Sequence, residues 1–445
     1  MNSAKPLLQS DVRPCEVWAW AMYDFANSGY TTVVITALFN AYFVAVIAGN
    51  AEWATFAWTA ALSASYLLIV LSAPVVGAYA DQRAAKKRLL AVSTAGCVLF
   101  TALLFYARPG MLGYAIACLV ASNFFFSSGE NLIAAFLPEL SRSRAMGRIS
   151  GWGWSLGYIG GLATLGLCLL YVAWAEARGR TAVQFVPVTM LITAAIFALA
   201  SLPTFILLHE RAVPGIIHDK WWRQAWLEVW RTVRGLREFA DLGRFLLCSF
   251  FYQAGIQAVI TLTAIYADQA MRFTTQEILL LVLMVNVTAA VGAALFGSLQ
   301  DRIGHIRAMA LILTVWIAAI VLAWLAQTRL LFWIAANIVG LCLGASQSGG
   351  RALVGLLTPP SRLAEFFGLW GLAVKLGSIA GPLTYGVTTW LTGGDHRRAL
   401  LFTGGYFVAG LLLLAGVQVS RGRRAALRSE RVARRELQAA RVLQK

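Results

Sequence analysis

The chain has 445 residues, of which 59% are hydrophobic and only 13% are charged, and its formal net charge is +17. Soluble domains carry about 25% charged residues, so this chain has too little polar sequence to cover a globule in water. The composition excludes an ordinary soluble protein and indicates a protein whose surface faces lipid.

Twelve apolar stretches are long enough to cross a bilayer, which requires about 20 apolar residues each. We therefore predict an all-α membrane protein with twelve transmembrane helices in two six-helix bundles. The first stretch is too long for a secretory signal and has no basic segment directly before it, so we expect it to be retained. The predicted spans are Val17–Ala48, Ala54–Ala80, Leu89–Ala107, Met111–Leu137, Gly147–Ala173, Phe185–Leu208, Phe245–Tyr266, Glu277–Leu299, Arg307–Ala326, Leu330–Leu357, Phe366–Leu391 and Ala399–Val419.

The segments between and after the spans divide the chain into four parts. These are an N-terminal bundle (1–208), a connection (209–243), a C-terminal bundle (244–419) and a basic tail (420–445). Within the connection, Asp219–Leu242 places tryptophans and other apolar residues at alternating spacings of four and three, which predicts an amphipathic helix at the membrane surface. We expect the tail to face anionic membrane lipids.

The basic residues are distributed unequally across the predicted topology. Most of the 37 lie in the two termini, the connection and the loops on the same side of the bundle. The positive-inside rule therefore predicts that both termini are cytoplasmic. We expect the membrane to be a bacterial inner (plasma) membrane. Because the charge is explained by orientation, we expect no nucleic-acid partner. The loops on the other side hold only Arg108, Arg178, Arg180, Arg272, Arg329, Arg397 and Arg398.

An internal repeat with an offset of 220 residues relates the two halves of the chain. Gly77 and Asp81, at the end of the second span, recur as Gly297 and Asp301 at the end of the eighth. Two halves repeated in parallel are the organisation of secondary transporters whose site lies between the halves. The same offset relates Ser128 and Gly129 to Ser348 and Gly349, Ser141 and Arg142 to Ser361 and Arg362, and Gly151, Gly157 and Gly161 to Gly371, Gly377 and Gly381.

The repeated motif has a physical interpretation as a gate. Glycines such as Gly77 and Gly297 allow helices to approach closely, and Asp81 and Asp301 can accept hydrogen bonds from the exposed N–H groups of a neighbouring helix N-terminus. Such a contact forms only when the cytoplasmic side is closed. We assign these four residues and Arg302 to a gate; the alternative is a simple helix cap.

Four ionisable residues lie inside predicted spans, where charge is costly and is usually paired or faces water: Asp24, Glu130, Arg351 and Lys375. Glu130 and Arg351 are almost equivalent in the repeat, so we interpret them as a salt bridge. Two acids and two bases suit a zwitterion such as an amino acid, and either acid is a candidate site for a coupling proton. A purely structural ion pair near the gate is the alternative. Further polar residues that line the cavity or bridge helices are Asn27, Gln253, Gln257 and Asn286.

Several segments resemble a known transporter family. Gly77–Asp81 and Gly297–Arg302 resemble the loop motif of the major facilitator superfamily, although Gln82 stands where a basic residue commonly follows the aspartate. Trp18–Val34 and Asn131–Gly161 resemble the vacuolar amino-acid effluxer-like branch, first known from autophagy in yeast. The resemblance implies the major facilitator fold, a cavity lined by helices 1, 4, 7 and 10, alternating access and amino-acid efflux.

The alternatives to an amino-acid effluxer are a transporter of a drug, sugar or lipid and a membrane receptor that transports nothing. We expect no enzyme, because the nucleophile-elbow pattern at Gly153–Gly157 lies in an apolar helix. We also expect no cofactor: the sequence contains no phosphate-binding loop for ATP, and its histidines and cysteines have no metal-ligand spacing. A monomer that binds a small-molecule substrate and membrane lipids is the predicted assembly.

Overall fold

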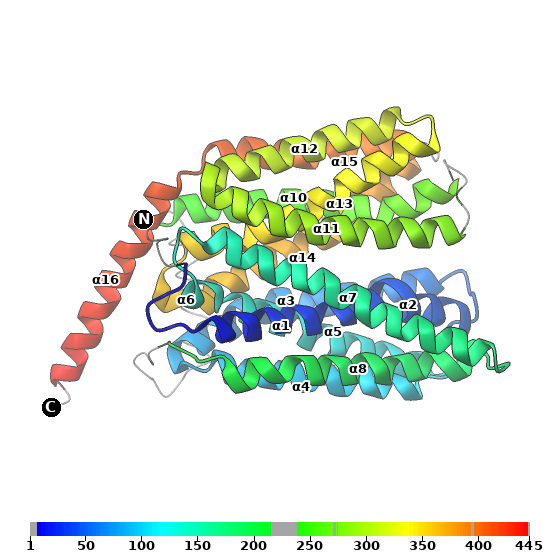
Figure 1. Ribbon diagram of the computed structural model, residues 1–445, viewed down its shortest axis with the longest axis horizontal. Helices are drawn as coiled ribbons and strands as arrows, with labels where there is room; N and C mark the ends of the chain where they lie inside the picture. The colour runs from blue at the N-terminus through cyan, green and yellow to red at the C-terminus, as the bar shows by residue number, and fades with distance from the viewer. Residues whose placement is uncertain are drawn as a thin grey trace, which may run out of the picture.

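The computed structural model describes residues 7–212, 214, 238–269, 273, 275–392 and 396–443. This part of the chain is built from long helices that run side by side along the molecule (Figure 1). Eleven helical segments within it are long and apolar enough to cross a membrane, and α10 adds a further helix of 30 residues. The predicted all-α membrane fold is confirmed, and each of the twelve predicted spans falls on a helix.

The first half contains the following elements: α1 (Pro14–Tyr30), η1 (Thr31–Ala37), α2 (Leu38–Tyr42), η2 (Phe43–Ile47), α3 (Ala54–Arg83), α4 (Lys86–Leu103), η3 (Leu104–Tyr106), α5 (Leu112–Ala134), α6 (Leu137–Leu140), α7 (Met146–Glu176) and α8 (Ala182–Leu207). The second half contains α10 (Ala240–Gln269), α11 (Thr275–Ile303), α12 (His305–Leu325), α13 (Arg329–Leu357), η5 (Pro360–Arg362), α14 (Leu363–Leu391) and α15 (His396–Ala415), and α16 (Val419–Leu443) follows it.

The structure differs from the sequence prediction in local detail. The first span is one continuous helical rod, but η1 and η2 are π-helical turns within it, which the hydrophobic pattern does not reveal. The fourth span ends earlier than predicted, and the short helix α6 follows it with Pro138 in its first turn. The predicted amphipathic helix Asp219–Leu242 lies outside the described residues except for its last five positions. The basic tail forms the helix α16.

The helices pack as two groups that meet along two main seams. In the first group α1 packs against α7 and α8, and α4 packs against α5 and α8. In the second group α11 packs against α13, while α10 packs against α14 and α15. Across the groups, α7 packs against α11 and α3 packs against α14. One seam therefore joins the fifth span to the eighth, and the other joins the second span to the eleventh.

The outer faces of the helices carry large apolar side chains exposed outside the protein. Leu170, Ile206, Trp390 and Leu412 are each at least two-thirds exposed, although they lie within spans. Apolar exposure on this scale requires contact with lipid, because in water it would make the protein aggregate. Helices also satisfy their backbone hydrogen bonds internally, as the hydrocarbon core demands.

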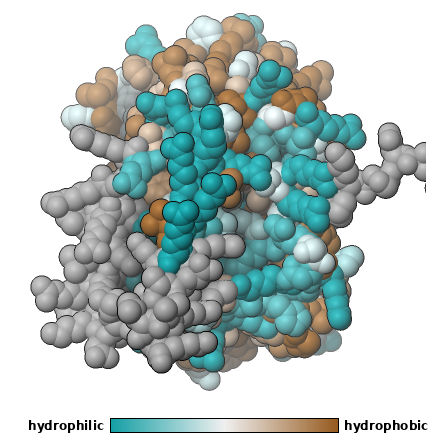
Figure 2. All heavy atoms as spheres, turned by 90° about the vertical axis from the view of Figure 1, so that its left-hand side faces the viewer, coloured by the Kyte–Doolittle hydropathy of each residue, from teal (hydrophilic) through white to brown (hydrophobic). Residues whose placement is uncertain are grey.

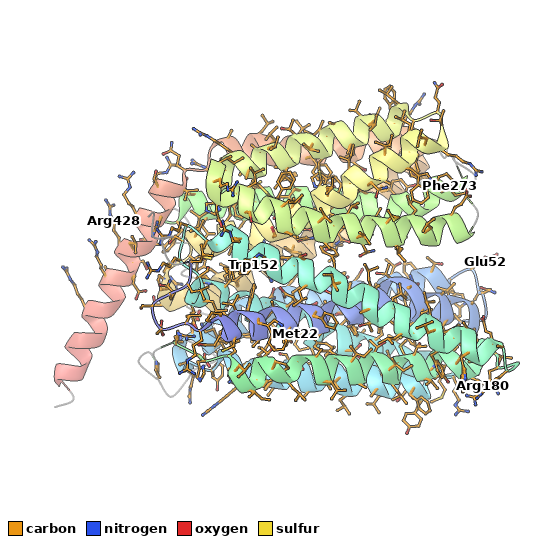
Figure 3. All side chains as sticks on the ribbon, in the orientation of Figure 1. Met22, Glu52, Trp152, Arg180, Phe273 and Arg428 are labelled. Carbon is orange, nitrogen blue, oxygen red and sulfur yellow. The ribbon has the colours of Figure 1, made fainter. Side chains whose placement is uncertain are left out.

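One end of the bundle carries the described N-terminal residues, α6 and α16, and we call it the terminal end (Figure 1). Hydrophilic residues cover much of this end, while hydrophobic residues lie around its rim (Figure 2). Figure 3 places Arg428 on α16 at the terminal end, and Glu52 and Arg180 at the opposite end. The polar surface of the terminal end marks it as a region outside the hydrocarbon.

Candidate functional site

The four ionisable residues predicted inside the spans form two ion pairs, and each pair joins the two halves. Arg351 Nη1 lies 2.7 Å from Asp24 Oδ2, and Lys375 Nζ lies 3.2 Å from Glu130 Oε2. The predicted Glu130–Arg351 salt bridge is therefore wrong. The prediction relied on the near-equivalence of these two residues in the repeat. The rotation of each helix about its own axis gives them different partners. Both acids come from the first half and both bases from the second.

Arg351 is held by several groups at once. Its Nε donates to the Ser150 hydroxyl at 3.1 Å, and its Nη2 donates to the Ser150 carbonyl at 2.9 Å. The guanidinium carbon lies 4.6 Å from the ring centroid of Trp20 and 5.4 Å from that of Trp154, within the range of cation–π attraction. Asp24 and Ser150 accept hydrogen bonds from all three guanidinium nitrogens, and the two rings lie beside the cation. A buried charge requires such partners.

A glycine on α7 makes room for the Asp24–Arg351 pair. A Cβ atom built on Gly153 would lie 2.4 Å from Asp24 Oδ2 and 2.6 Å from Arg351 Nη2. No real Cβ atom approaches oxygen or nitrogen so closely, so any other residue would displace one member of the pair. The small residues at four-residue spacing in α7 thus allow α1 to lie against it, as small residues do at membrane helix interfaces.

Lys375 has a more open environment. Its ammonium lies 5.3 Å from the ring centroid of Tyr66 and 5.8 Å from that of Phe126. The Glu130 side chain keeps 27% of its surface exposed, against 10% for Lys375. Lys375 is the thirteenth residue of α14, about 18 Å along the helix at 1.5 Å per residue. This places the pair well inside the bundle.

The other polar residues predicted for the cavity do not join the two ion pairs in any hydrogen bond recorded for the described residues. Gln253 and Gln347 exchange hydrogen bonds of 2.8 and 3.4 Å within the second half. Asn286 donates to a carbonyl four residues earlier in its own helix, and Gln257 is half-buried. Asn27 is buried, and its Oδ1 has no hydrogen-bond partner in the described part of the chain. Of these residues, Asn27 lies one helical turn from Asp24.

The first predicted gate contact joins α3 to the N-terminus of α14. Asp81 accepts hydrogen bonds from the backbone N–H groups of Ala364, at 3.1 Å, and Glu365, at 2.9 Å. A Cβ atom on Gly77 would lie 2.2 Å from the Ala364 carbonyl oxygen, so only glycine permits this approach. The carboxylate lies where the exposed N–H groups and the helix dipole favour negative charge.

The second gate contact repeats the first with the halves exchanged. Asp301 accepts hydrogen bonds from the N–H groups of Gly147 and Arg148 at the start of α7, both at 2.9 Å. A Cβ atom on Gly297 would lie 2.5 Å from the Gly147 carbonyl oxygen. Arg302, the remaining predicted gate residue, is exposed. Both gate contacts lie at the terminal end, so the two halves are closed against each other there.

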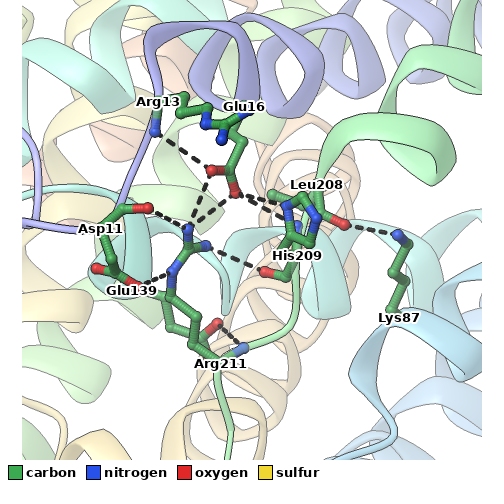
Figure 4. A network of polar contacts seen from close by, with 8 residues as sticks. All are labelled: Asp11, Arg13, Glu16, Lys87, Glu139, Leu208, His209 and Arg211. Atoms are coloured by element: carbon green, nitrogen blue, oxygen red, sulfur yellow. Dashed lines mark hydrogen bonds and ion pairs between the residues drawn. The ribbon is translucent and has the colours of Figure 1, made fainter.

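A charged network at the terminal end was not predicted from the sequence (Figure 4). Arg211, just after α8, binds Glu16 at 3.0 Å and Asp11 at 2.7 Å. Its hydrogen bond holds the pKa of the Asp11 carboxyl below its usual value. The backbone N–H of Arg211 also donates to Glu139, which forms an ion pair with the buried Lys86. The network ties the start of the first span to the end of the sixth.

The second half carries an equivalent tie. Asp241, at the start of α10, accepts two hydrogen bonds of 2.6 Å from Arg421 of α16 and one of 2.8 Å from the N–H of Gln418. In both halves, a carboxylate in the first turn of the half's first span binds an arginine that follows the last span of the same half. Sequence signals for this tie exist, namely an acid at each helix start and an arginine beyond each sixth span.

Comparisons with known proteins agree with this architecture. The family model described as vacuole effluxer Atg22 like matches residues 13–427. The chain is 28% identical over 410 residues to an uncharacterized MFS-type transporter, YxiO, of Bacillus subtilis (strain 168), covering 90% of this chain and 94% of that protein. It is 26% identical over 325 residues to autophagy-related protein 22 of Cryptococcus neoformans var. neoformans serotype D (strain B-3501A), covering 68% of this chain but only 58% of that protein.

A solved structure gives the fold. The human organic anion transporter MFSD10 matches with a TM-score of 0.71 at 16% identity, over 90% of this chain and all of that chain. This fold and the match to an MFS-type transporter over nearly the whole chain define a transporter of the major facilitator superfamily. Within that superfamily, the chain belongs to the vacuole effluxer Atg22-like family. The family model is described as an effluxer, and the Bacillus relative and the solved structure are described as transporters.

Proposed function

We propose that this protein is a secondary active transporter that exports small zwitterionic solutes, with amino acids as the substrate class. The observation that supports this most directly is the arrangement of the buried charges: Asp24 and Glu130 belong to the first half, and Arg351 and Lys375 to the second. A zwitterion carries both complementary charges, so it can bind an acid of one half and a base of the other.

Alternating access follows from the same arrangement. The gate aspartates Asp81 and Asp301 hold the terminal end closed, and each inter-half ion pair lies in the part of its helices nearer that end. A substrate that competes for one partner of an ion pair weakens the link between the halves, so binding favours the exchange of states. Protonation of an acid has the same effect, which supports proton coupling.

The proposed site of action is a bacterial inner (plasma) membrane, with the terminal end in the cytoplasm. The match to a Bacillus transporter over nearly the whole chain and the excess of basic residues at the terminal end support this location. The effluxer description of the family supports export as the direction. Since the charged centre is complete within one chain, we propose that the monomer is the working unit.

The test is flux in proteoliposomes that contain purified protein. Radiolabelled leucine, tyrosine and lysine, together with glucose as a sugar control, are assayed with and without an imposed pH gradient. We expect accumulation of at least one zwitterionic amino acid, accelerated by the gradient, and none of glucose. Sugar flux would replace the proposed substrate class, and binding without flux would indicate a receptor.

A further inference from the structure

The two inter-half ion pairs contain the same kinds of charge but differ in how fully they are satisfied. Arg351 uses all three of its guanidinium nitrogens, on Asp24 and on the hydroxyl and carbonyl of Ser150. Only 3% of its side chain is exposed, and tryptophan rings cover the guanidinium. A ligand would have to displace several short contacts to reach this cation.

Lys375 has a single hydrogen bond to the residues that the structure describes, the 3.2 Å contact with Glu130. An ammonium group has three donors, so two are available for another acceptor. Glu130 is the most exposed member of the two pairs, with 27% of its side chain accessible. When Lys375 releases this carboxylate, water can solvate it, which lowers the cost of breaking the pair.

The surroundings of Lys375 also suit an organic ligand. The rings of Tyr66 and Phe126 lie beside the ammonium, at 5.3 and 5.8 Å. Ring faces attract cations and offer apolar surface to a hydrophobic side chain. A carboxylate that approaches Lys375 therefore meets a cation, and the remainder of the same molecule meets aromatic surface and the freed Glu130.

We infer that the two pairs have different duties. Glu130–Lys375 is the pair that exchanges with substrate, with Lys375 binding the substrate carboxylate and Glu130 its ammonium group. Asp24–Arg351 is a brace that joins α1, α7 and α13 while the terminal end is closed, and it does not contact substrate. This assignment rests on the proposed function, and it narrows the substrate to amphipathic carboxylic acids with a nearby ammonium group.

The first test needs no substrate. Cys15 is replaced by serine, because it is the exposed native cysteine among the six. In this background, which keeps the five buried cysteines, one variant carries Glu130→Cys with Lys375→Met, and another carries Asp24→Cys with Arg351→Met. The double changes avoid a stranded charge. We expect a water-soluble methanethiosulfonate reagent to label position 130 at least about tenfold faster than position 24, whereas equal or reversed rates would overturn the assignment.

A second reporter position replaces position 24 if the position-24 variant misfolds. Ser150→Cys keeps both ion pairs, and Ser150 is fully buried beside Arg351. If the position-24 variant is not monodisperse in detergent, the labelling rate of position 150 replaces it. If position 150 is labelled as fast as position 130, the assignment of Asp24–Arg351 as the closed pair is wrong.

The second test uses tyrosine and tyramine, which differ in the carboxylate alone. Wild-type protein should bind or transport tyrosine at least about tenfold better than tyramine, since a hydrogen bond to a charged group is typically worth this much or more. Lys375→Met should bring the ratio close to one, and Lys375→Arg should restore part of it. The Asp24→Asn, Arg351→Met double variant should keep a high ratio even where its thermal stability falls.

The outcomes separate the two proposals. A tyrosine preference that survives in Lys375→Met but vanishes in the Asp24→Asn, Arg351→Met variant would reverse the duties of the pairs while leaving amino-acid transport intact. If wild-type protein handles neither compound and no other amino acid, the proposed function is wrong. The labelling rates still decide in that case whether Glu130–Lys375 is the open pair.

Discussion

Gly153 of α7 leaves the space in which Asp24 of α1 meets Arg351 of α13. An added Cβ atom would meet both members of the pair, and it would also lie 2.8 Å from the ring of Trp20. A glycine within a helix normally weakens that helix, because it loses more conformational entropy on folding than alanine does. Its presence here therefore reflects a steric requirement of the buried charges rather than a preference of the helix.

The first prediction concerns this steric requirement. Gly153→Ala should destabilise the protein by about 1–3 kcal/mol, the usual cost of an overpacked site, because Asp24 or Arg351 must move. The measurement is the melting temperature of the purified protein in detergent. Gly166→Ala in the same helix is the control: nothing lies within 4 Å of an added Cβ there, so its melting temperature should stay equal or rise. Equal effects of the two changes would show that Gly153 does not hold the pair.

At this scale the sequence predicts which residues are buried and charged but not how they pair. Hydrophobic context alone identified Asp24, Glu130, Arg351 and Lys375 as residues inside spans. The partner of each depends on the rotation of its helix about its own axis, and a rotation of one residue, about 100°, changes which neighbour is met. The assignment of Arg351 to Glu130 failed for this reason.

Among the helices, the two gate contacts are mutually equivalent. Asp81 on α3 binds the N-terminus of α14, and Asp301 on α11 binds the N-terminus of α7. Each contact uses a helix of one half to cap a helix of the other. The repeat in the sequence predicts both aspartates and both glycines, because the motif has a strict spacing. It does not predict the helix N-termini that they bind, because those lie in segments distant along the chain.

The second prediction concerns this closure. Asp81→Asn removes the negative charge at the α14 N-terminus, a contribution of typically 0.3–1 kcal/mol and up to about 2 kcal/mol when partly buried. The Asp81→Asn, Asp301→Asn double variant should open the terminal end more than either change alone. The readout is the labelling of Ser348→Cys, a fully buried position, by a soluble thiol reagent added from the terminal side.

A control distinguishes the gate from the general charge of this end. Asp11→Asn removes a carboxylate that is 63% exposed, lies at the same end and binds Arg211 within the first half. It should leave the labelling of Ser348→Cys unchanged. If the double gate variant also labels at the wild-type rate and transports normally, the two aspartates are only helix caps.

For the molecule as a whole, length and hydrophobicity identify all twelve spans because a helix in lipid must be long, apolar and internally hydrogen-bonded. The same reasoning misses the ties at the terminal end, Glu16 with Arg211 and Asp241 with Arg421, since surface charges are abundant there and only the fold selects which ones meet. These ties fasten the first and sixth spans within each half. In the proposed alternating-access cycle, the inter-half contacts are then the links that must break.

The third prediction is the orientation of the molecule. Reporter domains fused after Ser420 and inserted within the connection should both be cytoplasmic, because basic residues concentrate in these segments and the positive-inside rule keeps such segments from crossing the membrane. A reporter inserted at Gly179, in the turn between α7 and α8, should lie on the opposite side. Activity of a reporter that requires export, compared with one that requires the cytoplasm, measures each location. An exported signal from the tail or the connection would reverse the orientation, and the gate formed by Asp81 and Asp301 would then close the external side instead.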